Sequence, residues 1–496
     1  MTPSEGADAE LEGRLFIDGA WRSPHGDRWA PVRDPSTGAT FARAAVGTRE
    51  DARAAVDAAA ASADRWASTP GHERSRFLLE IAVRLLAQRE RIARLIAREV
   101  GKPITDARVE VDRAAGVFRL SAEEIRHLTG ETYPADAYAM PPGNEHRFLF
   151  TLRDPLGVVV AIGPFNFPLN LLAHKIGPAL GAGNTVVAKP ASAAPLTALA
   201  LAGIAEAAGT PAGVLNVVPG RGGEVGDALV EHPSTRLVTF TGSTEVGKGI
   251  AERAGRHAKR VLLEMGGLDP LIVLDDAPLD RAVAAAVRGA FSFAGQVCTA
   301  SKRILVDTAV ADRFVEKFVT SVRALKLGPA LDETTQVGPV VAPESIDRLD
   351  TLVGEARGRA AQLLVGGGRA EELGEGWFYR PTVLDRVPPE ARIAREEPFG
   401  PVAPILRFDD PDAAIALANG TSYGLQAAVF TRDLARAFDF ARRIRAGGVH
   451  INDPTTLRWD ALPFGGVRES GLGREGVRSA MHEMTDVKLV SVNVGR

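Results

Sequence analysis

The chain of 496 residues is longer than one hydrophobic core usually serves, so we expect two or three domains. Its 59 Lys and Arg nearly balance 62 Asp and Glu, which predicts neither nucleic-acid binding nor attraction to an anionic membrane. The single cysteine, Cys298, excludes an internal disulfide and a cysteine-based zinc site; we expect no metal centre and a reducing, cytoplasmic setting.

The first part of the chain shows helical patterning and one stretch that requires a membrane check. The acidic start, residues 1–14, lacks the basic end and apolar core of a signal peptide. Helical patterns follow at residues 49–66 and 72–100, so we expect the first 130 residues to be mostly helical. Residues 155–173 carry no charge, but their prolines and asparagines predict a strand, a turn and a new helix rather than a membrane span.

From about residue 154 the sequence alternates short apolar runs with helical patterns. Strands are expected at residues 157–163, 184–190, 214–220 and 236–242, and helices at 168–180, 195–208, 224–230 and 244–254. Buried strands rich in Val and Ile, separated by helices, indicate a parallel sheet that is covered on both faces. We therefore expect a doubly wound α/β domain, whose ligands lie at the carboxyl ends of the strands.

The same pattern restarts at residue 267 and predicts a second α/β domain that extends to about residue 470. Its expected strands are 270–276, 303–307, 362–367, 402–408, 425–431 and 447–452, with a helix over 282–293. Two further segments, 146–155 and 485–493, are expected as strands that fit neither sheet. The predicted fold class is therefore α/β, with two doubly wound parallel-sheet domains and a small β element outside both.

Two glycine-containing loops follow successive strands of the first domain. "PGRGGEVG" places Gly222 and Gly226 after one strand, and "FTGSTEVG" places Gly242 and Ser243 at the start of a helix. Free backbone N–H groups and the positive end of a helix dipole suit a pyrophosphate. Each loop alone is more often an ordinary turn or a capped helix, but two on one sheet favour a bound nucleotide.

Four side chains near the ends of predicted strands are candidates for chemistry. Asn166, in the turn "GPFNFP", can satisfy turn backbone or donate to a developing oxyanion. Lys189 is a solvated strand-end charge or lies beside a ribose or phosphate. Glu264 ends the apolar run "RVLLE", where a buried carboxylate gains the raised pKa of a general base unless it is salt-bridged. Cys298 follows a helix that stops at Gly295, so it is a packed hydrophobe or, beside a cation or N–H groups, a nucleophile.

Seven motifs together resemble those of the aldehyde dehydrogenase superfamily, in family order and over nearly the whole chain. They are "PFNFP", "AGNTVVAKPA", "FTGSTEVG", "LEMGG", "GQVC", "EEPFGPV" and "PFGGVRESGLGREG". The C-terminal run "GREGVRSAMHEMTDVKLV" is most similar to the branch with lactaldehyde, non-phosphorylating glyceraldehyde-3-phosphate and phosphonoacetaldehyde dehydrogenases. The resemblance implies an enzyme that oxidises an aldehyde to the free carboxylic acid with NAD or NADP.

The resemblance also implies a mechanism for three of the candidates. Cys298 attacks the aldehyde carbonyl to form a thiohemiacetal, whose oxyanion the Asn166 amide and the Cys298 backbone N–H stabilise. Hydride transfer to the nicotinamide leaves a thioester, and Glu264 activates the water that hydrolyses it. Members that make acyl-CoA typically lack this glutamate, so Glu264 argues against an acyltransferase or reductase. A non-catalytic relative need not keep all three residues.

Cofactor positions and domain roles follow from the same resemblance. The implied cofactor-binding residues are Gly163, Phe165, Lys189, Ser192, Gly222, Gly226, Gly242, Ser243, Glu397 and Phe399. Lys189 would reach the adenosine ribose, Glu397 the nicotinamide ribose, and Phe399 the nicotinamide ring. The implied division is a cofactor-binding domain at 1–130 and 152–266, a catalytic domain at 267–473, and oligomerisation strands at 131–151 and 474–496. Such strands pair family members into a homodimer or homotetramer.

Departures from the family pattern bear on specificity. Ser192 stands where many NAD-preferring members have a glutamate that binds the ribose 2′-hydroxyl, so NADP is an alternative to NAD. Val297 stands where the glyceraldehyde-3-phosphate enzymes have an arginine, which disfavours that phosphate. Arg113 and Arg458 match anion-binding positions, or are solvated charges. We expect a small hydroxy- or anionic aldehyde, with an aromatic or aliphatic aldehyde or a semialdehyde as the alternative.

Overall fold

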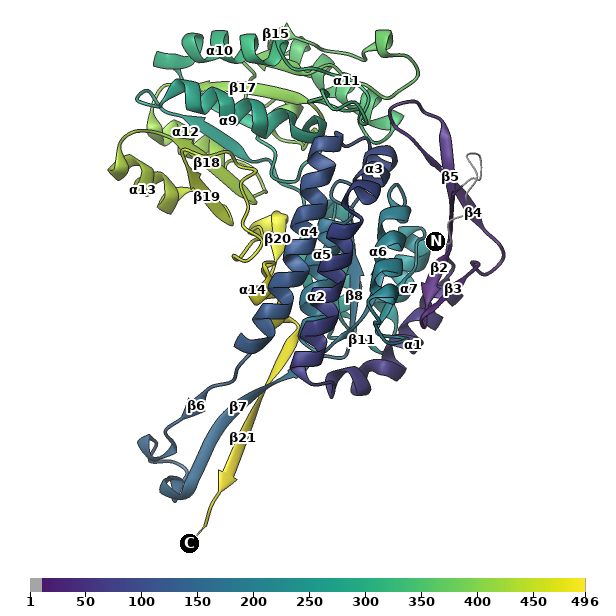
Figure 1. Ribbon diagram of the computed structural model, residues 1–496. Coiled ribbons are helices and arrows are strands. Elements are labelled where there is room, and N and C mark those ends of the chain that lie inside the picture. Colours follow the sequence, from purple (N-terminus) through teal and green to yellow (C-terminus); the bar gives the residue numbers. More distant parts are fainter. Residues whose placement is uncertain (1–10, 496) are drawn as a thin grey trace.

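The computed structural model describes residues 11–495, which form two large sheets, two three-stranded sheets and the helices around them (Figure 1). Residues 1–10, most of the segment compared with a signal peptide, lie outside the described part. Among the described helices, none has the length and apolar character needed to cross a membrane. The uncharged stretch 155–173 contains strand β8 (Val158–Ile162), a turn and the start of helix α5 (Asn170–Gly181), as predicted.

The first large sheet has eight strands in the order β20-β12-β11-β8-β9-β10-β2-β3. Its five middle strands are parallel, and β20, β2 and β3 join antiparallel at the two ends. Besides β8, the strands are β9 (Thr185–Lys189), β10 (Leu215–Val217), β11 (Thr235–Thr241), β12 (Arg260–Glu264), β20 (Gly471–Leu472), β2 (Leu15–Ile17) and β3 (Ala20–Arg22). The four strands predicted between residues 157 and 242 are all present.

Helices cover both faces of this sheet, because alternate residues of each strand point to opposite sides. On β8, Val159 and Ala161 belong to the core packed with α5 and α6, whereas Val158 and Val160 belong to the core packed with α1, α7 and α8. The helices of this part are α1 (Arg49–Ala67), α2 (Gly71–Ala87), α3 (Arg89–Val100), α4 (Ile104–Glu124), α6 (Pro195–Ala207), α7 (Asp227–Glu231), α8 (Thr244–Gly255) and α14 (Val477–Glu483). The doubly wound prediction is confirmed.

The N-terminal part differs most from the prediction, because its first described residues form strands rather than helix. Strands β1 (Leu11–Gly13), β4 (Trp29–Arg33) and β5 (Thr40–Ala45) make a separate three-stranded sheet. They have three to six residues each, too few for an alternating pattern to stand out in the sequence. The predicted helix at 72–100 is also divided into α2 and α3, because the chain turns at Gln88.

The second large sheet has seven strands in the order β15-β16-β17-β14-β13-β18-β19, all parallel except the β15–β16 pair. The strands are β13 (Pro270–Val273), β14 (Arg303–Asp307), β15 (Gln362–Val365), β16 (Thr382–Asp385), β17 (Val402–Phe408), β18 (Gln426–Phe430) and β19 (Gly448–Ile451). The helices are α9 (Leu279–Phe291), α10 (Thr308–Arg323), α11 (Pro343–Gly358), α12 (Pro411–Asn419) and α13 (Leu434–Arg443). Among the seven strands of this sheet, the four-residue β16 is the one that was not predicted.

A three-stranded sheet projects from the body of the molecule (Figure 1). It contains β6 (Thr132–Tyr133), β7 (Arg147–Pro155) and β21 (Thr485–Asn493), and β7 pairs antiparallel with β21 over its whole length. β7 and β21 are the two segments predicted as strands outside both large sheets, and the two-residue β6 was not expected as a strand.

Candidate active site

The loops after β8 and β11 lie where the strand order of the first sheet reverses. From β8 the chain continues to β9 and β10 on one side, and then returns to β11 on the other side of β8. Parallel sheets open a crevice beyond the carboxyl ends of the two strands at such a point. The loop after β8 contains Asn166, and Gly242 follows β11. A predicted catalytic residue and a predicted pyrophosphate loop therefore lie at the same crevice.

Asn166 is bonded to the segment that carries Cys298. Its Nδ2 donates to the backbone oxygen of Gln296 over 2.9 Å, and its Oδ1 accepts from the backbone N–H of Phe167 over 3.1 Å. The side chain is buried. Because an amide nitrogen has two hydrogens, the bond to Gln296 orients the group and leaves a second donor. The structure thus brings together Asn166 and the Cys298 loop.

A left-handed turn leads from α9 to Cys298. Phe293, Ala294 and Gly295 have φ angles of 46°, 53° and 68°. Residues other than glycine rarely adopt this conformation, which costs on the order of 1–3 kcal/mol per residue. The turn ends the helical path, so that Cys298 lies on a connection before β14, as predicted.

Burial and charge govern the ionisation of Cys298 and Glu264. Glu264 is 1% exposed, and no residue in the 11–495 range offers either carboxylate oxygen a partner with hydrogen-bond geometry. Burial, followed by repulsion from the Glu475 carboxylate, raises the pKa of Glu264 to about 8. Burial and the charge of Glu264 raise the pKa of the Cys298 thiol well above its usual value, while Lys302 and Arg458 oppose this. Both groups are therefore mainly protonated at neutral pH.

A buried ion-pair network borders Glu264. Lys175 Nζ donates to Glu475 Oε1 over 2.6 Å and to Thr241, which pairs with Glu264 across the sheet. Arg458 Nη2 donates to the other oxygen of Glu475 over 3.1 Å. Burial opposes the ionisation of Glu475, but Lys175 and Arg458 outweigh it and lower its pKa to about 2. Glu475 is therefore a permanent negative charge beside Glu264.

The two predicted anion-binding arginines converge on Asp460. Arg113, from α4, donates to both carboxylate oxygens of Asp460, over 2.5 and 3.1 Å. Arg458 Nε lies 3.9 Å from the same carboxylate, and His174 Nε2 lies 2.9 Å from it. Burial, followed by repulsion from Arg458, lowers the pKa of His174 to about 4, so the ring is neutral at pH 7. Both arginines are therefore paired rather than solvated.

The predicted adenosine end lies along the carboxyl edge of the first sheet. Lys189 is buried at the end of β9, and burial lowers its pKa to about 8. Ser192 donates to the backbone oxygen of Gly220 over 3.3 Å. Gly222 and Gly226 bracket one helical turn, where a Cβ at Gly222 would meet no described atom within 4 Å. This edge combines a buried cation with an open glycine turn.

The predicted pyrophosphate loop requires glycine at one position. A Cβ at Gly242 would lie 2.5 Å from the Phe240 ring. Ser243 is the N-cap of α8, and its side chain makes no capping hydrogen bond with the described residues. Gly163 donates its N–H to Lys189 O over 3.0 Å, which ties the loop after β8 to the neighbouring strand. A helix start without a side-chain cap fits a phosphate group.

The predicted nicotinamide end brings together Phe165, Phe399 and Glu397. The rings of Phe165 and Phe399 meet edge to face with centroids 5.8 Å apart. Glu397 Oε1 lies 2.8 Å from Lys302 Nζ, but outside hydrogen-bond geometry, so this buried oxygen has no hydrogen-bond donor within residues 11–495. Lys302 also donates to the backbone oxygen of Cys298. An unsatisfied buried acceptor fits a ribose hydroxyl, and these residues together fit NAD or NADP.

Several site residues were missed in the sequence. Lys175 and His174 were hidden in the apolar pattern of α5, and Glu475 in a glycine-rich motif. A charge inside an otherwise apolar helix was the one available signal, because such charges are buried only when paired. Lys302 gave none, since it lies in a mixed segment and is buried by tertiary contacts.

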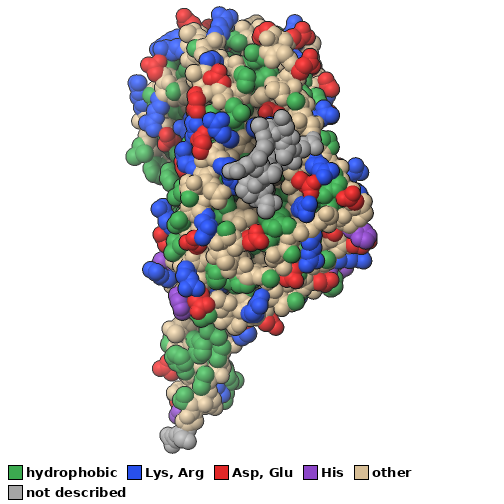
Figure 2. All heavy atoms as spheres, turned by 45° about the vertical axis from the view of Figure 1, so that its right-hand side comes forward, with side chains coloured by type: hydrophobic (Ala, Val, Ile, Leu, Met, Phe, Trp, Pro, Cys, Tyr) green, Lys and Arg blue, Asp and Glu red, His purple; other side chains and the backbone are tan. Residues whose placement is uncertain are grey.

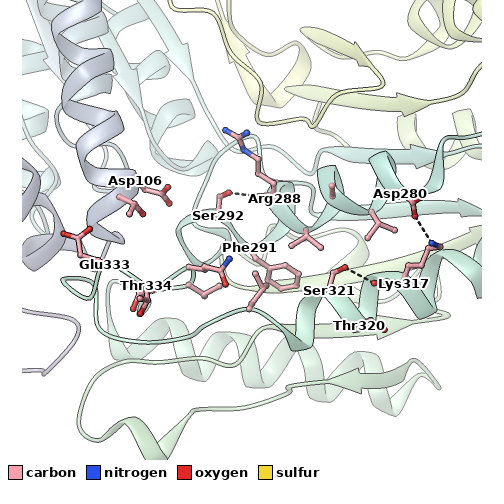
Figure 3. Close-up of a pocket in the computed structure, with 18 of the residues that line it drawn as sticks. Asp106, Asp280, Arg288, Phe291, Ser292, Lys317, Thr320, Ser321, Glu333 and Thr334 are labelled. Carbon is pink, nitrogen blue, oxygen red and sulfur yellow. Dashed lines mark hydrogen bonds and ion pairs between the residues drawn. The ribbon is translucent and has the colours of Figure 1, made fainter.

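A separate cavity of about 1070 Å³ lies along α9 and α10 (Figure 3). Its lining includes Asp106, Arg288, Ser292 and Glu333, and an ion pair between Asp280 and Lys317 lies at one side. It contains none of the predicted site residues. We therefore do not assign the reaction to this cavity.

Nearly the whole chain matches one family of known proteins. The model of the aldehyde dehydrogenase family matches residues 21–490. The chain belongs to the aldehyde dehydrogenase family. This aldehyde dehydrogenase is 40% identical to the lactaldehyde dehydrogenase of Methanocaldococcus jannaschii, over 97% of this chain and 100% of that protein. It is also 40% identical to the 3-sulfolactaldehyde dehydrogenase of Priestia aryabhattai, over 97% of this chain and 98% of that protein.

The fold of this aldehyde dehydrogenase is also that of solved structures. A glyceraldehyde-3-phosphate dehydrogenase from Methanocaldococcus jannaschii, complexed with NADP, superposes with a TM-score of 0.89 at 40% identity, over 94% of this chain and 100% of that one. The predicted superfamily and branch, the fold class, the dehydrogenase activity towards an aldehyde, and NAD or NADP as cofactor are thereby confirmed.

Proposed function

We propose that this enzyme oxidises a small hydroxy- or anionic aldehyde to the free acid through Cys298, with Asn166 in the oxyanion site and Glu264 as general base. The main support is one juxtaposition: the Asn166 amide is bonded two residues before Cys298, while the buried, unpaired Glu264 interacts with the thiol. The function rests on these three residues acting at one carbonyl carbon.

Cys298 is the nucleophile in this mechanism. Its thiol releases a proton to solvent water as sulfur bonds to the aldehyde carbon, which is the net proton of the oxidation, and the Lys302 and Arg458 cations favour the thiolate. The second hydrogen of the Asn166 amide donates to the oxygen that becomes negative, together with the backbone N–H of Cys298. A fixed donor of this kind contributes roughly 3–4 kcal/mol. When bound, NAD or NADP supplies the hydride acceptor.

Glu264 activates the water that releases the acid. Its two oxygens are free of hydrogen bonds within residues 11–495, so they can accept a proton from water next to the thioester on Cys298. The pKa of about 8 places the base near the pH at which it must exchange protons. Hydrolysis cleaves the carbon–sulfur bond. Glu264 then donates its proton to the Cys298 thiolate, which becomes a thiol again.

Charge in the pocket supports a polar or anionic substrate. The cations Arg113, Arg458 and Lys175 face the carboxylates of Asp460 and Glu475, which leaves one cation in excess while Glu264 is protonated. Relatives named for lactaldehyde and 3-sulfolactaldehyde support the same substrate class. A semialdehyde, which carries a carboxylate, is the second candidate, since the succinate-semialdehyde dehydrogenase of Escherichia coli is 37% identical over 97% of this chain.

The non-reacting parts of the cofactor have candidate partners. Gly242 and Ser243 would contact the pyrophosphate at the start of α8, and Lys189 the adenosine ribose, beside Gly222 and Gly226. Glu397 would accept from the nicotinamide ribose, with Gly163, Phe165 and Phe399 around the ring. Ser192 adds no carboxylate near the 2′ position, so a 2′-phosphate meets no repulsion there.

The two sheets and the projecting strands have separate proposed roles. The sheet of residues 152–266, with residues 1–130, would bind the cofactor, and residues 267–473 would carry the nucleophile. Segments 131–151 and 474–496 would join chains into a homodimer or homotetramer. Figure 2 shows hydrophobic side chains gathered on the projection, where the exposed ones include Tyr138, Met140, Phe148, Leu152, Val487, Leu489, Val492 and Val494. Such an exposed strand edge pairs readily with another chain. The lone cysteine supports a reducing, cytoplasmic setting.

A substrate panel tests the function. We expect kcat/KM to be highest for lactaldehyde, 3-sulfolactaldehyde or succinate semialdehyde, each measured with NAD and with NADP. Simple aliphatic and aromatic aldehydes serve as the comparison. A preference for benzaldehyde or hexanal would refute the polar-substrate proposal, and a requirement for coenzyme A would refute hydrolysis.

A further inference from the structure

Lys102 is a fully buried lysine between the loop that carries Asn166 and the turn that leads to Cys298. It is 0% exposed, and its Nζ forms an ion pair with Glu110. The same ammonium lies 3.6 Å from the centroid of the Phe167 ring and 4.7 Å from that of Phe293. Phe167 follows Asn166 directly, and Phe293 belongs to the left-handed turn before Cys298. The Lys102 ammonium therefore contacts both Phe167, next to Asn166, and Phe293, in the turn that leads to Cys298.

Glu110 extends this contact into the backbone after Asn166. Its Oε1 accepts from the N–H groups of Leu169 and Asn170, over 2.9 and 3.1 Å. Its Oε2 faces Lys102. The Lys102–Glu110 pair thus contacts both ends of the segment 167–170, with Glu110 in α4 and Lys102 in the connection just before it, outside the two loops.

The turn side of the contact is fixed equally well. Gln296 donates to Phe293 O, accepts from the N–H of Val341 over 2.9 Å, and offers its own backbone oxygen to Asn166. The rings of Phe167 and Phe293 lie edge to face, with centroids 6.5 Å apart, and Lys102 contacts both. A displacement of either ring would therefore change the distance between the Asn166 amide and the Cys298 segment.

Stability alone does not explain a buried charge here. Removing two charges from water costs several kcal/mol per ion, and apolar residues of the same volume often stabilise a core as well or better. What an apolar replacement lacks is direction: the lysine bonds one carboxylate and attracts the faces of two rings. A pair of this kind restricts the core to one arrangement.

We propose that the Lys102–Glu110 ion pair positions the oxyanion donor Asn166 relative to the nucleophile Cys298. It does so by fixing the rings of Phe167 and Phe293 relative to each other. Neither Lys102 nor Glu110 touches the substrate, so both are positioning residues that act through Asn166. This inference rests on the proposed role of Asn166. It extends that role to the start of α4 and the connection before it, which the reaction does not reach.

A double-mutant cycle tests the proposal with the full-length enzyme and saturating NADP. Lys102→Met keeps the length of the side chain and removes its charge. We expect kcat to fall about 10²-fold with little change in KM, the size expected when reacting groups shift by about 1 Å. In an Asn166→Ala background the same change should lower kcat by less than about threefold, because the donor it positions is already absent.

Further arms separate positioning from folding. Arg407→Met breaks a partly buried ion pair with Asp385, in the second sheet and outside both loops, and should leave kcat unchanged. Lys102→Met should bind NADP with unchanged Kd. Lys102→Arg, which keeps the charge, should recover part of kcat. If Lys102→Met does not fold, Glu110→Gln is measured instead in the parent and Asn166→Ala backgrounds. The same difference in kcat loss between the two backgrounds is then expected.

Two results would overturn the proposal: equal losses from Lys102→Met in both backgrounds, or a kcat within about threefold of the parent. If Asn166→Ala alone leaves kcat unchanged, the proposed role of Asn166 fails and this inference with it. If Asn166→Ala lowers kcat and the losses are additive, the positioning role alone fails.

Discussion

Because the pKa of Glu264 is raised, replacing it by Gln should lower the turnover number and increase the stability of the fold. Replacement by Gln keeps the shape of the side chain and removes its ionisation. If the carboxylate is the base, as proposed, the parent should gain deacylation rate as the pH rises through about 8, and Glu264→Gln should lose this gain. The loss expected for a general base is about 10²–10⁴-fold in kcat.

The stability effect follows from the same pKa. Below pH 4.5 the carboxyl is protonated in both the folded and the unfolded chain, so its contribution is unchanged there. Between pH 4.5 and about 8 the unfolded chain releases the proton while the folded chain keeps it, which destabilises the parent progressively. At about 1.4 kcal/mol per pKa unit, the shift corresponds to roughly 5 kcal/mol above pH 8. Glu264→Gln avoids this cost.

Two measurements check these predictions. Steady-state kcat from pH 6 to 9.5, with a burst of NAD(P)H to identify deacylation as the slow step, should give a single rise near pH 8 in the parent only. Thermal unfolding at pH 5, 7 and 9 should show a Tm advantage of Glu264→Gln that grows with pH. The reasoning is refuted if this variant keeps the parent pH profile, or if its Tm advantage is constant or shrinks as the pH rises.

Four further predictions concern individual side chains. Cys298→Ala should abolish NAD(P)H formation while NADP still binds by fluorescence titration; turnover in this variant would contradict the nucleophile. Glu475→Gln should move the kcat rise of Glu264 to lower pH, because a repelling charge is lost; an unmoved or higher midpoint would contradict that cause. Ser192→Glu should lower kcat/KM with NADP at least tenfold relative to NAD, since like charges side by side cost several kcal/mol; equal effects on both cofactors would contradict it. Arg113→Met should raise KM for 3-sulfolactaldehyde about 10- to 100-fold, the loss of one charge-assisted hydrogen bond, and affect lactaldehyde less; equal effects would contradict anion binding.

Local sequence patterns predicted the strands that are buried on both faces. β8, β14 and β17 have five to seven residues, β8 is apolar throughout, and the other two are built around the apolar runs Ile304–Val306 and Val402–Leu406; the predicted bounds lie within two residues of those observed. The pattern failed for β2 and β3, three residues each, which become strands only because they extend a sheet formed by later parts of the chain. Edge strands of this length depend on tertiary pairing that no local pattern contains.

In the candidate site too, some residues could be inferred from local sequence patterns, and others depend on tertiary contacts. Cys298, Glu264 and Asn166 stand next to strands and within motifs, so their positions could be inferred from sequence. Glu110 lies in a helical segment and Lys102 in the connection before it, and both are buried by contacts with distant parts of the chain: Glu110 with the segment after β8, and Lys102 with Phe167 and Phe293. The residues proposed to react could be picked out from the sequence, and those proposed to support them depend on contacts between distant segments.

The left-handed turn before the nucleophile places a folding cost where the enzyme needs rigidity. Ala294 holds a backbone conformation that glycine adopts freely, so glycine there would relieve it, whereas the buried ring of Phe293 would leave a cavity. The relaxed chain would also gain freedom in the segment whose backbone oxygen orients Asn166. Selection for heat resistance alone would therefore favour glycine at a turn where selection for turnover opposes it, and variants at this turn should trade one property against the other.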